Sequence, residues 1–212
     1  QYKTGGSSSL LLSDMHQIKE GRFGGNVKLI TDCNLTQDVD IHGDLMLAKT
    51  LDVKEHKVTV GGNLYTIEKG KLVMGNTEAY VLVKGDVNYG TVSTGSGCKF
   101  TDGTLEVKGD YTDPNYTDIN ENHTLLLSGD SLQTVACNAY LGTLELNNHS
   151  EAGVYSENTI HKKKLLLNGC NLTIGDGTGI YGFTLDDDYV VEQNLTLLDD
   201  TLDLNGYTLT VK

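Results

Sequence analysis

Short stretches in which apolar and polar residues alternate recur along most of the chain. Residues 202–211 read LDLNGYTLTV and residues 51–60 read LDVKEHKVTV, with looser copies between them. Alternation with a period of two places neighbouring side chains on opposite faces of an extended strand, so each stretch predicts a β-strand with one buried face. Asn205 and Gly206, between the two halves of the last stretch, predict a tight turn.

Pairs of Gly, Asn and Asp, which favour tight corners, follow these strands at a nearly constant interval. Most successive pairs are 18 to 24 residues apart, and they stand at residues 43–44, 62–63, 85–86, 109–110, 129–130, 147–148, 168–169 and 205–206. The longest step, of 37 residues, spans two repeats. A period near 20 residues with strands and no helical pattern predicts a stack of turns, in which each turn buries its apolar face against its neighbours.

The sequence therefore predicts an all-β fold, a single-stranded parallel β-helix or β-solenoid of roughly nine or ten turns. An up-and-down barrel or a β-sandwich is the competing fold, and it would need hairpins that join antiparallel strands. Similar stretches at constant phase favour parallel stacking instead, because stacking places like residues above like.

The two ends of the chain differ from the repeats. Residues 1–24 contain a Gly-Gly-Ser-Ser-Ser run, which predicts a flexible start, and residues 10–18 are expected to cap the open end of the stack. Residues 25–212 are expected to form the solenoid domain. The chain begins at Gln1 without a signal peptide and its pattern still runs at Lys212, so we expect a piece of a protein that continues beyond it.

Composition and charge limit the partners. One proline, no tryptophan and 25 glycines suit strands and corners. A net charge of -13 repels phosphate backbones, so nucleic acid is not expected as a partner. The same charge weighs against polyanionic substrates unless bound cations mediate. No apolar run approaches the roughly 20 residues of a membrane helix, so no membrane span is expected in this stretch.

Four cysteines, Cys33, Cys98, Cys137 and Cys170, stand far apart and form no CxxC motif, which disfavours a zinc-finger site. Two interpretations stay open. They are buried as small hydrophobic side chains in a stacked core, or they form two disulfides in an exported protein.

Three stretches carry a resemblance. Residues 127–135 (LSGDSLQTV), 141–148 (LGTLELNN) and 194–211 (NLTLLDDTLDLNGYTLTV) resemble the right-handed parallel β-helix repeats of exported bacterial adhesin-like surface proteins. The resemblance covers about residues 26–212 and carries no catalytic motif. It implies an extracellular or cell-surface setting, with a host or cell-surface glycan or protein as partner.

Two functions follow as hypotheses. The first is a non-catalytic structural or adhesive module of a secreted or cell-surface bacterial protein, which acts as a stiff spacer and an extended binding surface. The alternative is a carbohydrate-binding module or a divergent polysaccharide-degrading β-helix enzyme. The resemblance implies a basic residue, often arginine, for lyase chemistry, and the single arginine, Arg22, lies outside the repeats. Open strand edges would also allow end-to-end association between copies.

The stretch at residues 113–122 is the most loop-like insertion and the first choice for a contact site, because loops on a rigid scaffold tend to carry function. We expect ligand contacts from Tyr111, Asp113, Asn115, Tyr116 and Asp118. Oxygen atoms of residues 113, 115 and 118 would also suit Ca²⁺, although the stretch lacks the glycine and the terminal glutamate of an EF-hand loop.

Two acidic groups 13 residues apart would meet on adjacent turns and suit a hard cation such as Ca²⁺. They comprise Asp186, Asp187, Asp188, Asp199 and Asp200. The alternative is a pair of solvated corners. Apart from this Ca²⁺, no cofactor is expected.

The tyrosines predict no continuous aromatic ladder. Counted from the corner glycines, Tyr89 and Tyr111 have even offsets and Tyr65 has an odd one, so Tyr65 should face away from the other two.

Overall fold

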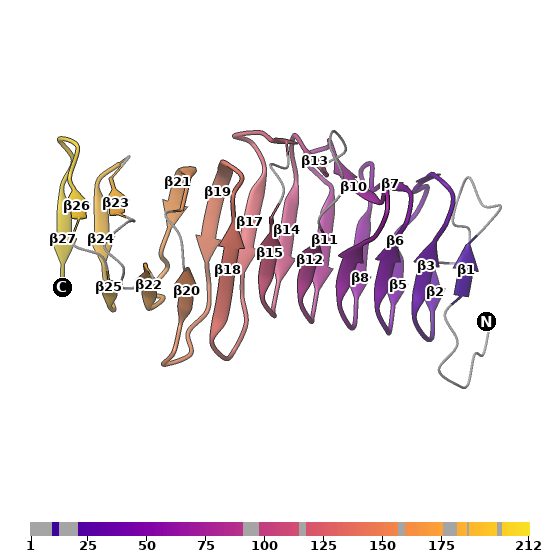
Figure 1. Ribbon diagram of the computed structural model, residues 1–212, viewed down its shortest axis with the longest axis horizontal. Helices are drawn as coiled ribbons and strands as arrows, with labels where there is room; N and C mark the ends of the chain where they lie inside the picture. The colour runs from indigo at the N-terminus through magenta and orange to yellow at the C-terminus, as the bar shows by residue number, and fades with distance from the viewer. Residues whose placement is uncertain are drawn as a thin grey trace.

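The computed structural model describes residues 10–12, 21–90, 98–114, 118–156, 160–175, 182–185, 187–198 and 201–212. The described residues form strands, turns and loops without a helix, and their strands pair in parallel along one rod (Figure 1). The fold is the predicted β-solenoid. Its roughly eight turns come close to the nine or ten expected.

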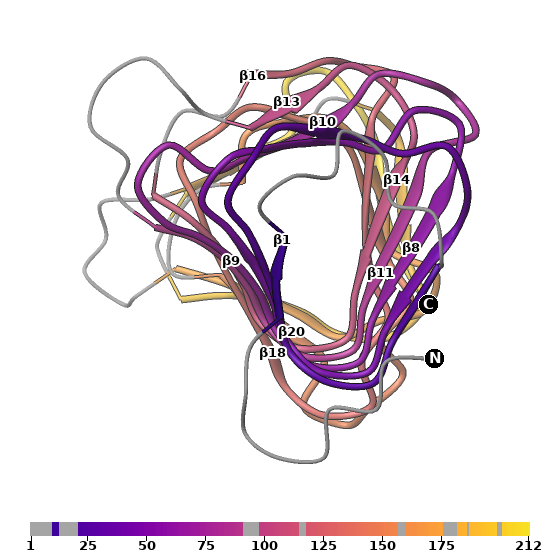
Figure 2. The same ribbon diagram turned by 90° about the vertical axis from the view of Figure 1, so that its right-hand side faces the viewer.

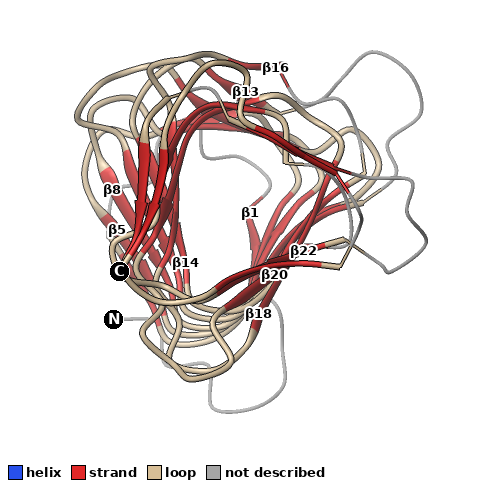
Figure 3. Cartoon of the chain, turned by 90° about the vertical axis from the view of Figure 1, so that its left-hand side faces the viewer, coloured by secondary structure: helices blue, strands red, loops and turns tan. Residues whose placement is uncertain are grey.

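Three sheets form the walls of the rod, and Figure 3 shows them in cross-section. Sheet A has ten strands in the described residues: β1 (Leu10–Leu12), β3 (Val27–Leu29), β6 (Leu45–Leu47), β9 (Leu64–Thr66), β12 (Val87–Tyr89), β15 (Tyr111–Asp113), β18 (Gln133–Cys137), β20 (Val154–Ser156), β22 (Leu172–Ile174) and β25 (Leu195–Leu197). Sheet B has eight: β2 (Arg22–Phe23), β5 (Val39–Ile41), β8 (Lys57–Val60), β11 (Tyr80–Val83), β14 (Thr104–Val107), β17 (Thr124–Leu127), β19 (Leu141–Leu146) and β21 (Lys162–Leu166).

Sheet C is the shortest wall. Its five strands among the described residues are β4 (Cys33–Asn34), β7 (Thr50–Asp52), β10 (Lys71–Met74), β13 (Lys99–Phe100) and β16 (Asp118–Ile119). Two further parallel pairs complete the C-terminal turns: β23 (Gly182–Thr184) with β26 (Thr201–Asp203), and β24 (Tyr189–Val191) with β27 (Leu209–Val211).

From β2 to β16 each turn visits the sheets in the order B, A, C, and from β17 to β22 the described strands alternate between sheets B and A. Seen from the N-terminal end in Figure 2, the chain runs clockwise as it recedes from the viewer, so the coil is right-handed. This is the predicted hand, and it is the hand that parallel strand connections almost always take.

The alternation seen in the sequence separates the interior of the rod from its surface. On β8, β11, β14 and β17 the apolar positions point inward and are buried, and the residues between them are partly exposed. Parallel register then places like over like, as in the column Val58, Val81, Leu105, Leu125 and Leu144. The core is therefore a set of stacked apolar columns that runs the length of the solenoid.

The corner between sheets B and A is held by a ladder of Asn and Asp side chains. Asn63 Oδ1 accepts a hydrogen bond from the backbone N–H of Asp86 at 2.8 Å, and Asp86 Oδ1 accepts one from Asp110 at 2.9 Å. We call this the corner ladder; its acceptors are Asn26, Asp44, Asn63, Asp86 and Asp110. Each side chain thus ties its own turn to the next one along the rod.

Glycine precedes Asn or Asp at these corners because the ladder leaves no room for a Cβ atom. At Gly85 a Cβ would lie 2.3 Å from Asn63 Oδ1 and 2.9 Å from the carbonyl oxygen of Gly62. Gly43, Gly62 and Gly109 are equally close to the acceptor of the preceding turn. The Gly-Asp and Gly-Asn pairs at these corners therefore share one role, in which the glycine leaves room for the side-chain acceptor of the preceding turn.

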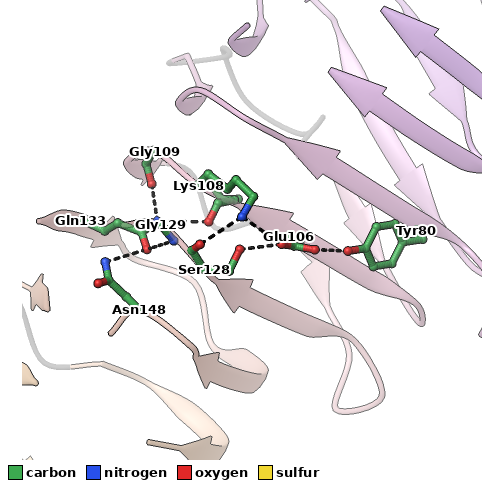
Figure 4. Close-up of polar contacts among 9 residues, drawn as sticks. Tyr80, Glu106, Lys108, Gly109, Ser128, Gly129, Gln133 and Asn148 are labelled. Carbon is green, nitrogen blue, oxygen red and sulfur yellow. Dashed lines mark hydrogen bonds and ion pairs between the residues drawn. The ribbon is translucent and has the colours of Figure 1, made fainter. Parts of the chain in front are cut away.

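A buried amide pair replaces the ladder where the corner lengthens after β17. The Gln133 side chain donates from Nε2 to the carbonyl oxygens of Val107 and Gly109, and its Oε1 accepts from Gly129 N–H at 2.7 Å (Figure 4). Asn148 Nδ2 donates to Gln133 Oε1 at 3.0 Å, and both side chains are fully buried. Because these amides satisfy backbone groups that the ladder no longer reaches, the stack continues without a break.

The middle of the core contains an aromatic and polar cluster. Tyr89 packs edge-on against Tyr111 with ring centroids 6.0 Å apart, and it also contacts Phe100. Both tyrosines are buried, whereas Tyr65 lies on the outer side of β9, so the predicted difference in facing is confirmed. His123 stacks on Phe100 at 4.7 Å and is 1% exposed.

The four cysteines are unbridged and buried. Burial raises the pKa of Cys98 and of Cys137 to about 12, so both are neutral thiols at neutral pH. Of the two interpretations of the cysteines, the structure shows the buried hydrophobic side chains.

Substitution of Gly85 by alanine tests the corner ladder. We expect Gly85→Ala to lower the free energy of unfolding by about 1–3 kcal/mol, the usual effect of overpacking a tight site. Urea denaturation followed by circular dichroism measures it. Gly24→Ala is the matched control, since a Cβ at Gly24 would meet nothing within 4 Å. Equal effects of the two substitutions would contradict the interpretation.

Acid should weaken the fold through His123. Burial lowers the pKa of His123 from 6.5 to about 4, so the unfolded chain binds more protons than the folded chain between these values. The stabilisation that neutral His123 provides is therefore complete above pH 6.5. As the pH falls toward 4 and through it, the free energy of unfolding decreases by roughly 3 kcal/mol in total. Urea denaturation should show His123→Phe gaining stability relative to the wild type as the pH falls. A difference that does not change with pH would refute this assignment.

Candidate functional site

The outer surface of sheet B, called the B face below, has a concave region near its N-terminal end. This B-face pocket has a volume of about 530 Å³. It is formed by neighbouring strands β2, β5, β8 and β11 and the residues that flank them, and its lining comprises Gly21, Arg22, Asp38, Val39, Asp40, Lys57, Thr59 and Lys84.

The carboxylates of the pocket already have partners. Asp38 Oδ1 accepts a hydrogen bond from the backbone N–H of Lys57 at 2.9 Å and lies 3.8 Å from His56 Nδ1. Asp40 Oδ2 lies 3.6 Å from His42 Nε2. The contacts of Asp38 tie it to the next turn, at the start of β8, and Asp40 lies beside a histidine of its own turn.

The cations of the pocket are in a different situation. In the part of the chain that the structure describes, no carboxylate forms an ion pair with Arg22, Lys57 or Lys84. The Lys57 ammonium instead lies 4.8 Å from the centre of the Tyr80 ring, a cation–π distance. All three cationic side chains are exposed to solvent, so they remain available to an anion.

A polar network lies on the turns that follow the pocket (Figure 4). Glu106 accepts hydrogen bonds from the Tyr80 hydroxyl and from Ser128 Oγ, and the Lys108 ammonium lies 3.7 Å from the same carboxylate. Lys108 also donates to the backbone carbonyl of Ser128 at 3.2 Å. Lys108 occupies the place after β14 that Lys84 occupies after β11, and only Lys108 has a carboxylate beside it.

A second concave region lies on the outer surface of sheet A. This A-face pocket, of about 390 Å³, is lined by Asn63, Leu64, Tyr65, Thr66, Asp86, Asn88 and Gly90. Burial and then the nearby Asp44 carboxylate raise the pKa of Tyr65, so its hydroxyl keeps its proton at neutral pH. The A-face pocket therefore combines one aromatic ring with amide and carboxylate groups.

The structure describes three of the five residues that were expected to contact a ligand, and two of them lie in the core. Tyr111 and Asp113 point into the core and are 1% and 0% exposed, because the alternation of β15 turns only Thr112 outward. Neither side chain reaches an outer surface. Asn115 and Tyr116 lie outside the described residues, and Asp118 is described only as part of the backbone of β16.

The acidic groups expected to bind a cation are only partly described. Asp187 and Asp188 are exposed, and Asp188 Oδ1 accepts a hydrogen bond from Thr208 N–H in the next turn at 2.6 Å. Asp186, Asp199 and Asp200 lie outside the described residues. Among the residues that are described, no three His, Cys, Asp or Glu side chains are grouped to hold a metal ion.

The pocket cations were not identified from the sequence. Arg22, Lys57 and Lys84 lie 35 and 27 residues apart, so no short motif contains them. The repeat could have indicated that these cations share a surface, because residues about one or two repeat periods apart in the sequence lie on neighbouring turns.

Comparison with known proteins adds no relative: no protein-family model, curated protein or solved structure matches this chain. Within the described ranges, no helix is long and apolar enough to span a membrane. The arguments below therefore depend on the chain's own geometry and on the resemblance of its repeats.

Proposed function

We propose that this chain is a non-catalytic structural and adhesive module of a secreted or cell-surface bacterial protein. In this role it acts as a stiff spacer whose outer faces bind a partner. The observation that carries the proposal is the continuous parallel stack, with ten strands in the described part of sheet A. The cell-surface setting is taken from the resemblance of the repeats alone.

Stiffness follows from the direction of the hydrogen bonds. The backbone bonds between turns run along the rod axis, and the corner ladder adds a side-chain bond at most turns of the N-terminal half. Bending or stretching the rod would have to lengthen bonds in several columns at once. Ten strands at about 4.8 Å spacing give a rod of about 45 Å.

Adhesion is supported by the outward side chains. The inward positions of the described turns up to β24 are buried in the core, whereas the outward positions can vary without disturbing it. On the B face they form a concave region with charged groups of both signs. Such a surface suits a polar partner that is held by several weak contacts.

A carbohydrate-active domain is the second candidate. The observation that favours it is the A-face pocket, where the Tyr65 ring lies beside Asn63 and Asn88. An aromatic ring flanked by amide groups can stack on a sugar and bond to its hydroxyls. A sugar-binding module of this kind is compatible with adhesion, whereas a polysaccharide-degrading enzyme is not.

A binding and turnover assay separates these functions. We expect the chain to bind a partner when it is screened against an array of glycans and surface proteins, with and without Ca²⁺. We also expect every polysaccharide tested to keep its chain length. Size-exclusion chromatography and reducing-end measurements detect cleavage. Progressive depolymerisation by the pure protein would overturn the non-catalytic proposal and favour the enzyme.

A further inference from the structure

The B-face pocket has a charge that differs in sign from that of the whole chain. The protein carries a net charge of -13, yet three cations and two carboxylates line this one concave region. The carboxylates each have a histidine nearby, and Asp38 also accepts a backbone N–H. The three cations have no carboxylate partner among the described residues.

The register of sheet B places these cations along one path. Arg22 lies on β2, Lys57 at the start of β8, and Lys84 directly after β11. Strands β2, β5, β8 and β11 are successive neighbours, so the outer cations are about 14 Å apart along the rod at 4.8 Å per strand. The pocket volume of about 530 Å³ is within the range of roughly 300–1,000 Å³ that is usual for small-ligand sites.

We propose that the B-face pocket binds an acidic saccharide, with its carboxylate or sulfate group paired with Arg22 and attracted by the charges of Lys57 and Lys84 on the neighbouring turns. This inference rests on the proposed adhesive function and gives it a ligand class. An arginine provides paired N–H donors that match an oxyanion, and the lysines add point charges at its edge.

The remaining groups of the pocket favour a saccharide over a bare anion or a dense polyanion. Asp38, Asp40 and the Thr59 hydroxyl can accept hydrogen bonds from sugar hydroxyls. The Tyr80 ring lies beneath the Lys57 ammonium, 4.8 Å from its centre, and so helps to position that cation. A polymer with a charge on every unit, such as nucleic acid, would be repelled by the acidic side chains and by the net charge.

The first experiment compares three probes by ¹H–¹⁵N correlation spectra of the whole chain. We expect methyl glucuronide to shift the backbone signals of residues 22, 57–59 and 84, and to bind at least five times more tightly than methyl glucoside. Sodium sulfate should bind more weakly than the glucuronide. Raising the ionic strength should weaken glucuronide binding, because salt screens exposed charges.

The second experiment uses substitutions on the same face. Arg22→Ala and Lys84→Ala should each weaken glucuronide binding by roughly two- to fivefold, as expected for exposed charge pairs. Lys164→Ala is the matched control and should leave the affinity unchanged, since Lys164 is an exposed cation on β21 of the same sheet, four strands beyond β11. Circular dichroism verifies that each variant is folded.

A substitution that strengthens binding gives a result that a loss of stability cannot explain. Glu106→Gln removes the charge beside Lys108 and should strengthen glucuronide binding by roughly twofold. Glu145→Gln changes the net charge equally, two turns farther along the same face, and should have no effect.

Three results would overturn the inference: equal affinity for the charged and the neutral sugar, equal affinity for sulfate alone, or unchanged affinity in a folded Arg22→Ala/Lys84→Ala variant. None of them would affect the proposed function, because a partner could still bind elsewhere on the rod. Conversely, depolymerisation of a polysaccharide would end the non-catalytic proposal while leaving this site in place.

Discussion

Hydrogen bonding between successive turns is the interaction on which the rest of this structure depends. In the described part of the chain every strand pairing is parallel, so each turn satisfies its backbone groups through the turns on either side. Where the strands stop, at the corner between sheets B and A, side-chain oxygens of Asn and Asp accept the N–H groups of the next turn. The spacing of the turns is thus maintained at a corner as well as in the walls.

This constraint explains several other features. At Gly43, Gly62, Gly85 and Gly109 a Cβ would lie 2.1–2.3 Å from the side-chain acceptor of the preceding turn, so glycine accompanies the ladder at these corners. Where the chain lengthens the corner, buried Gln133 and Asn148 take over the unsatisfied groups. These two buried amides therefore lie at this interruption of the regular pattern, because a buried backbone group without a partner is strongly unfavourable.

The same architecture separates stability from recognition. Inward positions are fixed by packing in columns, and a change there affects every neighbouring turn. Outward side chains do not take part in this packing, so charged residues can gather on one part of the surface. On the B face, three cations that have no carboxylate partner among the described residues lie near the N-terminal end, and a hydrogen-bonded network around Glu106 begins one turn later. A uniform scaffold can in this way carry one distinct site.

The sequence by itself determined the fold class, the parallel stacking, and the opposite facing of Tyr65 relative to Tyr89 and Tyr111. These features depend on the local period of two and on a repeat near 20 residues, both of which are visible without coordinates. The sequence did not show where strand β15 ends and the loop-like stretch after it begins. Tyr111 and Asp113 were expected to contact a ligand because they stand at that stretch, whereas both belong to β15 and lie in the core.

Only the tertiary structure decided which distant residues share a surface. The turns differ in length, from 18 to 24 residues between most corners, so a count along the chain does not align one turn with the next. Strand register does, and it places Arg22, Lys57 and Lys84 around one pocket while it gives Lys108 a carboxylate neighbour. The physical reason is that strand register is set by hydrogen bonds between turns, whereas the number of residues between equivalent positions changes from one turn to the next.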